Sequence, residues 1–337
     1  MKILFFLRYF RDQASSRVRG FDMAEELKRR GINCGIIYGS GKKNLLSFLL
    51  KLMKYDVIYF QKRYSERDIK LNKLARMIGR KTFFDIDDNP LGVNLNPKRG
   101  RQAETMMKIS SAVIVGSHKL RDFAQDFNKH VCLIPSPVDL NYYTPKKNLG
   151  NPNYTTLGWI GNGIVYKNDL QMLIKPLESL GGKYSIKLTL IGALGQEEIY
   201  ENFGRLRNIR LEIIDWVSSV DPLAVPSSIS DFDIGLYPLI NSEYNLYKCS
   251  LKALEYMAME VPVIASPVGE NRIVIDAGEN GFLASNAKEW EENISYLIEN
   301  ESVRKRMGKL GRRKIQENYS TEVCASKLIK VFENVEG

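Results

Sequence analysis

The alternation of short apolar strands with helical segments is the feature that most restricts the fold of this chain. In the first half, apolar runs suited to strands fall at residues 2–7, 36–38, 56–60, 82–86 and 112–115. Between them, apolar residues recur at helical spacing from Val18 to Leu27, ending at Gly31, and again over 71–78. A repeated order of strand and helix predicts a doubly wound α/β sheet of parallel strands.

The same alternation restarts after a segment without periodicity. Residues 145–153 are rich in Pro, Asn, Gly and Lys, which is typical of a linker. Beyond it, a helix is expected at 169–180, residues 289–336 are helical in pattern, and strands are expected at 156–160, 186–191, 211–214, 234–237 and 261–265. We therefore predict one α/β domain over 1–150, a second over 151–318 and a final helical segment over 319–337.

Length and composition are consistent with this division. The chain has 337 residues, of which 44% are apolar and 26% charged, as in soluble globular proteins. No apolar run reaches the roughly 18–20 residues of a membrane span, and the run after Met1-Lys2 is too short for a signal peptide. Reduced thiols in a cytoplasmic protein are predicted from four scattered cysteines without metal-ligand spacing, Cys34, Cys132, Cys249 and Cys324.

Positive charge is concentrated in the first half. Residues 1–150 contain 29 Lys and Arg against 14 Asp and Glu, whereas the remainder contains 20 against 25. This asymmetry favours an anionic partner, but no zinc, RNP-type or long basic-helix motif supports nucleic acid. The alternatives are an anionic membrane surface, a phosphorylated acceptor and a merely soluble basic surface. The basic, apolar stretch 42–54 fits either a membrane-surface helix or a helix that covers the sheet.

The stretch 246–268 has the chemistry of a nucleotide site. A loop with small and basic residues enters an apolar-faced helix, and free N–H groups at a helix N-terminus attract anions. Lys248 and Lys252 add positive charge there, although both also fit a solvated helix face. Glu255 lies about one turn further, where a carboxylate in a buried helix needs a partner. A phosphate at the helix N-terminus and a diol at the carboxylate are what a nucleotide offers.

This stretch resembles the donor-binding region of GT-B glycosyltransferases, in particular the GT4-like group. The segments Glu255-Tyr256-Met257-Ala258 and Val261-Pro262-Val263-Ile264-Ala265-Ser266 carry the resemblance. The family usually has an earlier glutamate that contacts the donor sugar, where this chain has Tyr247, which we therefore place among the expected donor-binding residues. It also usually has a glycine before Val-Pro, where this chain has Glu260. The resemblance implies two Rossmann-like domains facing a central cleft, with residues 321–335 crossing back onto the first domain.

Further donor-binding residues follow from the resemblance. The second domain opens with a glycine-rich turn at 157–163, which alone often reflects only tight packing. Relatives commonly have Gly-Arg and then a lysine that contact the donor diphosphate; here the corresponding residues are Gly161, Asn162 and Lys167. Lys248 or Lys252 then replaces the missing arginine charge. Asp215 and Trp216, which follow a strand, correspond to the loop that holds the base.

Carboxylates at the end of an apolar strand form the second candidate site. Asp85, Asp87 and Asp88 lie where α/β proteins bind ligands, and adjacent carboxylates allow one raised pKa for acid–base work. By resemblance, Asp87 and Asp88 take the place of a His-Asp pair, and we expect them to orient or deprotonate an acceptor hydroxyl. Helix capping is the alternative. Asp85-Ile86-Asp87 also matches the metal motif of the GT-A fold, which we discount because the second domain carries the donor region.

Two further loops are expected near the acceptor. Ser16, Arg17 and Arg19 follow the first strand, where serine caps and arginines make an anion site. His118 follows the strand at 112–115 and is a cleft candidate. The alternative is that Ser117 caps a helix and His118 is an ordinary surface residue.

Together these patterns predict a glycosyltransferase that uses a nucleotide-diphosphate sugar as co-substrate, with no cofactor and no metal. The expected acceptor is a hydroxyl of a glycan, a polysaccharide or a lipid-linked precursor, and the resemblance implies retention of anomeric configuration. UDP and GDP donors are not separable from the sequence. Two alternatives are a non-transferring nucleotide-sugar enzyme such as a GT-B epimerase, and a binding or scaffold protein. The expected location is the cytoplasm, with the inner face of the membrane as a further site.

Overall fold

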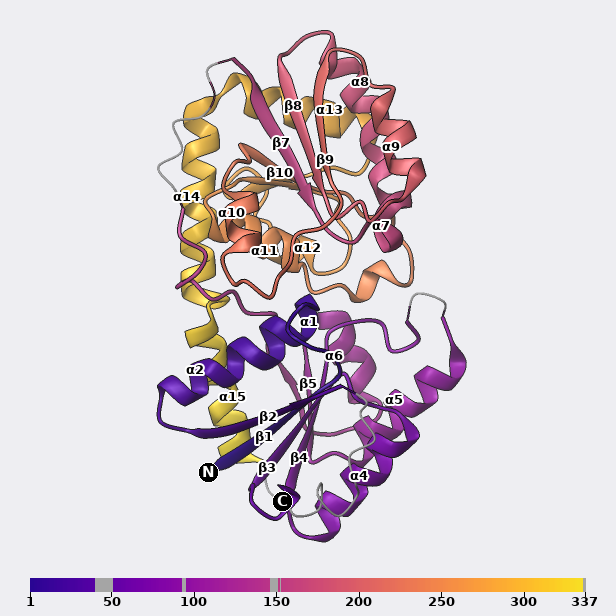
Figure 1. Cartoon of the computed structure of the whole chain (residues 1–337), viewed down its shortest axis with the longest axis vertical. Coiled ribbons are helices and arrows are strands. Elements are labelled where there is room, and N and C mark those ends of the chain that lie inside the picture. Colours follow the sequence, from indigo (N-terminus) through magenta and orange to yellow (C-terminus); the bar gives the residue numbers. More distant parts are fainter. Residues whose placement is uncertain (40–50, 93–94, 146–150, 152, 336–337) are drawn as a thin grey trace. The chain divides into compact units, whose positions relative to one another are not determined.

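The computed structural model describes residues 1–39, 51–92, 95–145, 151 and 153–335. The chain divides into two compact units (Figure 1). Unit 1 comprises Met1–Asp139, Leu246–Cys249 and Tyr319–Gly337, and unit 2 comprises Leu140–Asn245 and Ser250–Asn318. The division after Asp139 precedes the predicted boundary at residue 150. The short segment Leu246–Cys249 lies in unit 1, although its neighbours in sequence belong to unit 2.

Within the described residues, unit 1 contains one six-stranded sheet in which every neighbouring pair is parallel. In spatial order its strands are β2 (Asn33–Tyr38), β1 (Lys2–Leu7), β3 (Val57–Gln61), β4 (Lys81–Ile86), β5 (Ala112–Val115) and β6 (Val131–Leu133). Its helical segments are α1 (Ala14–Ser16), the π-helix η1 (Arg17–Asp22), α2 (Met23–Arg29), α4 (Glu66–Met77), α5 (Pro97–Ile109), α6 (His118–Gln125) and α15 (Thr321–Asn334).

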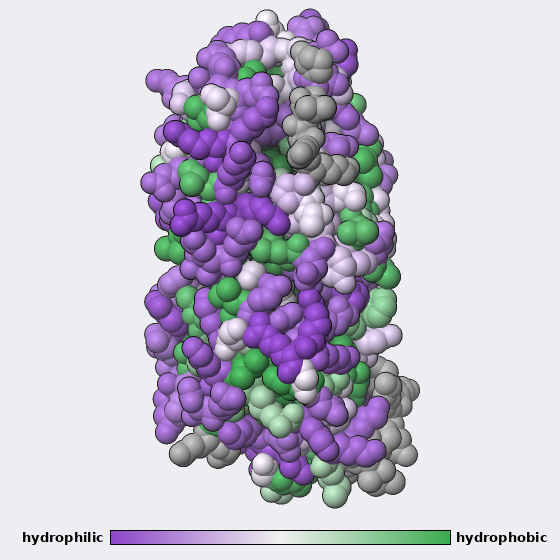
Figure 2. Space-filling model, turned by 90° about the vertical axis from the view of Figure 1, so that its left-hand side faces the viewer, coloured by the Kyte–Doolittle hydropathy of each residue, from purple (hydrophilic) through white to green (hydrophobic). Residues whose placement is uncertain are grey.

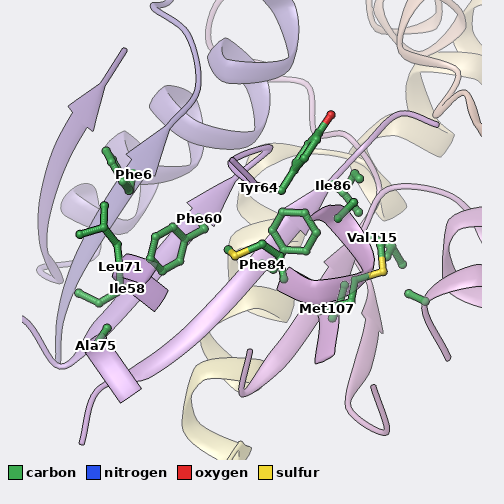
Figure 3. Close-up of a cluster of buried hydrophobic side chains, with 14 of the residues drawn as sticks. Phe6, Ile58, Phe60, Tyr64, Leu71, Ala75, Phe84, Ile86, Met107 and Val115 are labelled. Atoms are coloured by element: carbon green, nitrogen blue, oxygen red, sulfur yellow. The ribbon is translucent and has the colours of Figure 1, made fainter. Parts of the chain in front are cut away.

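Side chains alternate between the two faces along each strand, and both faces of this sheet carry apolar residues. Helices therefore cover both faces. On one face, Phe6, Phe60 and Phe84 pack with apolar residues of α4, α5 and α6 (Figure 3). On the other face, Phe5 and Phe83 pack with residues of α2 and α15. The final helix is therefore part of the unit 1 core.

Unit 2 repeats the architecture, with one six-stranded parallel sheet among the described residues. In spatial order its strands are β12 (Gly281–Leu283), β11 (Val263–Ala265), β10 (Ile234–Tyr237), β7 (Thr155–Ile160), β8 (Ile186–Ile191) and β9 (Ile209–Ile214). Its helical segments are α7 (Gly163–Leu170), the 3₁₀-helix η2 (Gln171–Leu173), α8 (Ile174–Gly181), α9 (Glu197–Gly204), α10 (Ala224–Ile229), α11 (Leu251–Ala258), α12 (Asn271–Val274), α13 (Ala287–Glu299) and α14 (Glu301–Asn318). A further 3₁₀ turn, η3 (Asn245–Tyr247), spans the boundary between the units.

Some predicted elements differ from those observed. The single helix expected at 169–180 is divided among α7, η2 and α8, and the strand expected at 261–265 begins at Val263. The helical tail is divided into α13, α14 and α15. Asn300 is the C-terminal cap of α13, and Ser320 is the N-terminal cap of α15. Most of the 42–54 stretch lies outside the described residues.

Surface hydropathy and helix length are the features of the fold that bear on contact with a membrane. The face that carries α14 is largely hydrophilic (Figure 2). No described helix combines the length and the apolar content needed to cross a membrane.

Candidate functional site

The loops that follow β1, β3 and β4 bring the acceptor-side residues of unit 1 together. Parallel neighbouring strands end at the same edge of a sheet, so residues distant in sequence meet there. Asp87 and Asp88 follow β4, Lys62 follows β3, and Lys248 reaches them from the segment Leu246–Cys249. These four side chains form a group that we call the lysine–aspartate group.

Asp88 lies between two lysines. Lys62 Nζ is 2.5 Å from Asp88 Oδ2, and Lys248 Nζ is 2.8 Å from Asp88 Oδ1. Burial opposes the negative charge, but Lys248 and Lys62 outweigh it and hold the pKa of Asp88 well below its ordinary value. A carboxylate with so low a pKa is a weak base, so the structure does not support Asp88 as the group that deprotonates a hydroxyl.

Asp87 shares one of these lysines. Its Oδ1 lies 3.1 Å from Lys62 Nζ, and its backbone carbonyl accepts a hydrogen bond from Cys249 Sγ at 3.1 Å. Burial opposes the charge of Lys62, yet Asp87 and Asp88 raise the pKa of this lysine above its ordinary value. The lysine–aspartate group thus sets two lysines against two aspartates.

Lys62 is the member that sequence analysis missed. It follows the last residue of β3 with φ of 55°, in the left-handed region that non-glycine residues rarely adopt. Its N–H donates to the carbonyl of Asp85 at 2.8 Å, which fixes the turn. Such a conformation costs about 1 kcal/mol or more and persists where the surroundings determine it. A lysine after a strand carries no sequence signal for this role.

Asp85 and Arg19 bind each other, which corrects the expectation of an open anion site at Arg19. Arg19 Nε and Nη2 donate to the carboxylate of Asp85 at 2.9 and 2.6 Å, and Tyr59 Oη donates to it at 2.6 Å. Arg19 Nη1 also donates to the carbonyl of Ile134 at 2.9 Å. Asp85 is fully buried and Arg19 nearly so. This pair ties η1 to β4 instead of binding a ligand, and it occupies the first carboxylate of the Asp-x-Asp metal motif.

Ser16 and Arg17 are also buried, which conflicts with the expected open anion site. Ser16 Oγ donates to Gln61 Oε1 at 3.0 Å, and so links the start of η1 to the end of β3. Arg17 lies near Asp22, whose pKa burial raises to about 6 against the opposing charges of Arg17 and Arg11. The first loop of unit 1 therefore uses these polar groups for internal bonds.

His118 and Tyr247 are the remaining predicted site residues that lie in unit 1. His118 is the first residue of α6, and Ser117 Oγ accepts from the N–H of Leu120 at 3.4 Å, as the capping alternative predicts. Tyr247 was expected among the donor-binding residues. It is instead buried in the core of unit 1 against Phe123, and its carbonyl accepts from Ser117 Oγ at 3.1 Å. Its bulk fills a core position.

The donor-side residues of unit 2 gather around the start of α11. Ser250 precedes this helix with φ of 55° and makes no side-chain cap; its Oγ donates to Asn271 Oδ1 at 2.6 Å instead. Because a helix N-terminus carries unsatisfied N–H groups, an uncapped start suits an anion. This is the environment expected for a phosphate.

Lys252, in the first turn of α11, is enclosed by aromatic rings. Its Nζ lies 3.7 Å from the ring centroid of Tyr166, 5.1 Å from that of Tyr237 and 5.9 Å from that of Trp159. Cation–π contacts of this kind hold an ammonium group in place without neutralising it. Lys252 is therefore positioned beside the helix N-terminus.

The glycine-rich turn after β7 packs tightly against this lysine and against the loop after β8. A Cβ on Gly161 would lie 2.6 Å from Lys252 Cε, and one on Gly163 would lie 2.4 Å from the carbonyl oxygen of Ala193. Asn162, between them, caps α7 by accepting from the N–H of Val165 at 3.3 Å. The asparagine that replaces the family's arginine thus has a helix-capping role.

Glu255 is buried in α11 and has a partner within unit 2. Tyr143 Oη donates to Glu255 Oε1 at 2.5 Å. Arg312 of α14 donates to the carbonyl oxygens of both Tyr143 and Ala258, which joins this tyrosine to the C-terminal end of α11. This contact orients the Glu255 carboxylate, a group that can accept several hydrogen bonds.

The remaining donor-side residues lie nearer the surface. Lys167 Nζ is 2.7 Å from Glu198 Oε1, an exposed ion pair of the kind that contributes little stability. Asp215 Oδ1 accepts from the N–H of Gly195 at 2.7 Å and so braces the loop after β8. Trp216 beside it is 49% exposed and offers an aromatic face. Among the residues that the structure describes, no group of three or more His, Cys, Asp or Glu side chains is arranged to hold a metal ion.

The donor-side residues of unit 2 lie within a segment that is similar to known proteins. Residues 154–300, which include β7, the glycine-rich turn and α11, match the family described as glycosyl transferases group 1. The match covers most of unit 2. The capsular polysaccharide biosynthesis glycosyltransferase CapM of Staphylococcus aureus is 27% identical over 188 residues, which cover 54% of this chain and 46% of CapM. The chain thus aligns with less than half the length of this relative.

Solved structures agree on the fold. HepE of Anabaena, in complex with UDP and glucose, superposes with a TM-score of 0.76 at 17% identity, over 99% of this chain and all of HepE. Sucrose-phosphate synthase of Thermosynechococcus elongatus gives 0.74 at 14% identity, over 99% and 98% of the two chains. The chain therefore has the GT-B fold, with two parallel α/β sheets.

Proposed function

We propose that this chain transfers a sugar from a UDP-sugar to a hydroxyl of a glycan, polysaccharide or lipid-linked acceptor. The observation that carries the proposal is the start of α11 in unit 2. An uncapped helix N-terminus, a lysine held by aromatic rings and a buried glutamate follow one another within six residues. The group 1 family match covers all three, and HepE was solved with UDP, UDP and glucose, and UDP-glucose.

Each group has a role in this proposal. The α11 N–H groups and Lys252 bind the diphosphate and stabilise the negative charge that develops on the leaving UDP. Glu255, oriented by Tyr143, accepts hydrogen bonds from the ribose diol, and Trp216 offers its exposed ring to the base. Because protein cations supply the positive charge, we include metal independence in the proposal.

The stereochemical outcome is a further part of the proposal. An inverting transfer requires a base that removes the acceptor proton during attack. Asp88 is held ionised between Lys62 and Lys248 with a lowered pKa, which makes it a poor base. This supports a reaction that retains anomeric configuration, with the lysine–aspartate group orienting the acceptor.

Isothermal titration of UDP and GDP, followed by UDP release from UDP-sugars with and without acceptors, tests the proposal. We expect UDP to bind more tightly than GDP, with affinity reduced about tenfold or more in Lys252→Met and Glu255→Gln. Lys305→Met on exposed α14 is the control and should match the native chain. UDP binding that neither site variant alters would refute this site. Conversion of the UDP-sugar without an acceptor would identify an epimerase instead.

A further inference from the structure

Two arginines at the acceptor edge of unit 1 surround one buried tyrosine. Arg8 follows β1, and its Cζ lies 5.2 Å from the ring centroids of both Tyr9 and Tyr64. Arg99 lies in the first turn of α5, with its Cζ 5.7 Å from the Tyr64 centroid and its Nη2 donating to Tyr64 Oη at 2.5 Å. We call this set the Arg8–Tyr64–Arg99 cluster.

The backbone makes room for one of these guanidinium groups. Gly92 has φ of +75°, and a Cβ there would lie 2.6 Å from Arg99 Nη1. Arg99 Nε is buried and has no hydrogen-bond acceptor among the described residues. The guanidinium is therefore seated by shape and by Tyr64, without a carboxylate bound to it.

The cluster carries uncompensated positive charge. Within the part of the chain that the structure describes, neither Arg8 nor Arg99 has a carboxylate oxygen within ion-pair distance. Asp88 is near enough to act on Arg99 electrostatically, but its two oxygens already contact Lys62 and Lys248. Among the described residues, Arg8 otherwise donates only to the carbonyl of Lys62, at 3.3 Å. Two like charges are thus held beside a network that is already neutral.

Stacking alone is a weak reason to hold two arginines in this way. A partly exposed cation–π contact contributes less stability than the ordering of an arginine side chain costs in conformational entropy. An oxyanion between or beside the guanidinium groups would offset their repulsion through charge-assisted hydrogen bonds. Tyr9, 40% exposed, offers an aromatic face next to them.

We propose that the Arg8–Tyr64–Arg99 cluster binds an oxyanion, a phosphate or a carboxylate, carried by the acceptor next to its sugar. The inference rests on the proposed function, since it assigns the substrate class of the same transfer. It places the acceptor's anion at the sheet edge that holds Asp87 and Asp88. The anion belongs either to a soluble acidic sugar or to the phosphate of a lipid.

The test compares sugars that differ only in an anionic group. Glucose 6-phosphate and glucuronic acid are each titrated against glucose by calorimetry, without UDP, using the native chain, Arg8→Gln, Arg99→Gln and the control Arg101→Gln. Arg101 is exposed on the same helix as Arg99. We expect the native chain and the control to prefer an anionic sugar by about tenfold or more, and both cluster variants to lose that preference.

The outcomes separate the inference from the proposed function. The inference would be overturned if the native chain showed no preference for either anionic sugar over glucose. It would also be overturned if Arg101→Gln lost that preference as fully as the cluster variants. A separate UDP titration tests the donor site, which none of these variants should alter. Vesicles of phosphatidylcholine with and without phosphatidic acid identify the source. Cluster-dependent binding to the acidic vesicles supports a lipid phosphate, and its absence beside a retained sugar preference supports a soluble acceptor.

Discussion

At the residue scale, the charges of unit 1 are arranged so that Asp88 remains ionised. Lys62 and Lys248, from distant parts of the chain, contact its two carboxylate oxygens. The backbone of Lys62 is in the left-handed conformation. An adjacent pair of carboxylates in a sequence suggests a raised pKa. Here the neighbouring cations reverse that expectation, because their attraction exceeds the cost of burial.

The pH dependence of stability tests this arrangement through Asp88→Asn. A carboxylate with a lowered folded-state pKa stabilises the protein above its unfolded pKa, and this contribution is lost as the pH falls through the folded value. We expect the variant to unfold about 2 kcal/mol more easily at pH 7, with the difference shrinking only as the pH falls below the ordinary aspartate pKa of about 4. Urea unfolding followed by far-UV circular dichroism measures this, with exposed Asp122→Asn as control. A difference that is constant with pH would contradict it.

Gly161 offers a second test at this scale. Its missing Cβ leaves space for Lys252 Cε and the ring of Trp159, so Gly161→Ala should displace the lysine from its aromatic contacts. We expect UDP affinity to fall about fivefold to tenfold and stability to fall by about 1–2 kcal/mol. Gly204→Ala is the matched control, because an added Cβ there meets no atom within 4 Å. Unchanged UDP affinity in Gly161→Ala would show that Lys252 does not depend on this glycine.

At the element scale, the alternation of strands and helices was largely predictable. Strands β1, β5, β8 and β10 have the predicted bounds, because continuous apolar runs are needed in sheets buried on both faces. Strands β6 and β12 were not predicted, since three residues are too few to define a period. The observed roles of Arg19 and Lys62 could not be predicted because their partners lie far away in the sequence, and sequence spacing does not specify such contacts.

The C-terminal end of α11 explains one departure from the family pattern. The N–H of Glu260 donates to the carbonyl of Met257 at 3.1 Å, and the N–H of Val261 donates to that of Tyr256 at 3.0 Å, which is the Schellman arrangement. Glu260 has φ of 59°, the conformation that favours glycine. The usual glycine at this position is therefore a requirement of the helix end, and Glu260 retains the turn with backbone strain.

Glu260→Gly should relieve that strain. We expect a gain of about 1 kcal/mol, seen as a rise of about 2–4 °C in the midpoint of thermal unfolding. Glu260→Ala, which removes the carboxylate but keeps a Cβ in the left-handed conformation, should gain much less. If both variants gain equally, the effect would arise from charge and the strain argument would fail.

At the scale of the whole molecule, the chain passes between its two units four times, after Asp139, Asn245, Cys249 and Asn318. Unit 1 therefore depends on segments from both ends of the sequence. Helix α15 contributes Phe332 to the unit 1 core, with ring centroids 4.7 Å from Phe83 and 6.1 Å from Tyr59. Phe332 is 1% exposed, so the core of the first sheet is incomplete until the last residues have been added.

Phe332→Ala in the full chain tests this dependence. Removing a buried phenylalanine should cost about 3–5 kcal/mol, and the cost should fall on unit 1, because the cavity lies between α15 and its sheet. Hydrogen exchange resolved by mass spectrometry should show lost protection in β1 and β4 and retained protection in β7 and β8. Lys330→Ala, exposed on the same helix, should leave both patterns unchanged. Equal loss of protection in both sheets would mean that the two units unfold together, with α15 stabilising the whole chain and not unit 1 alone.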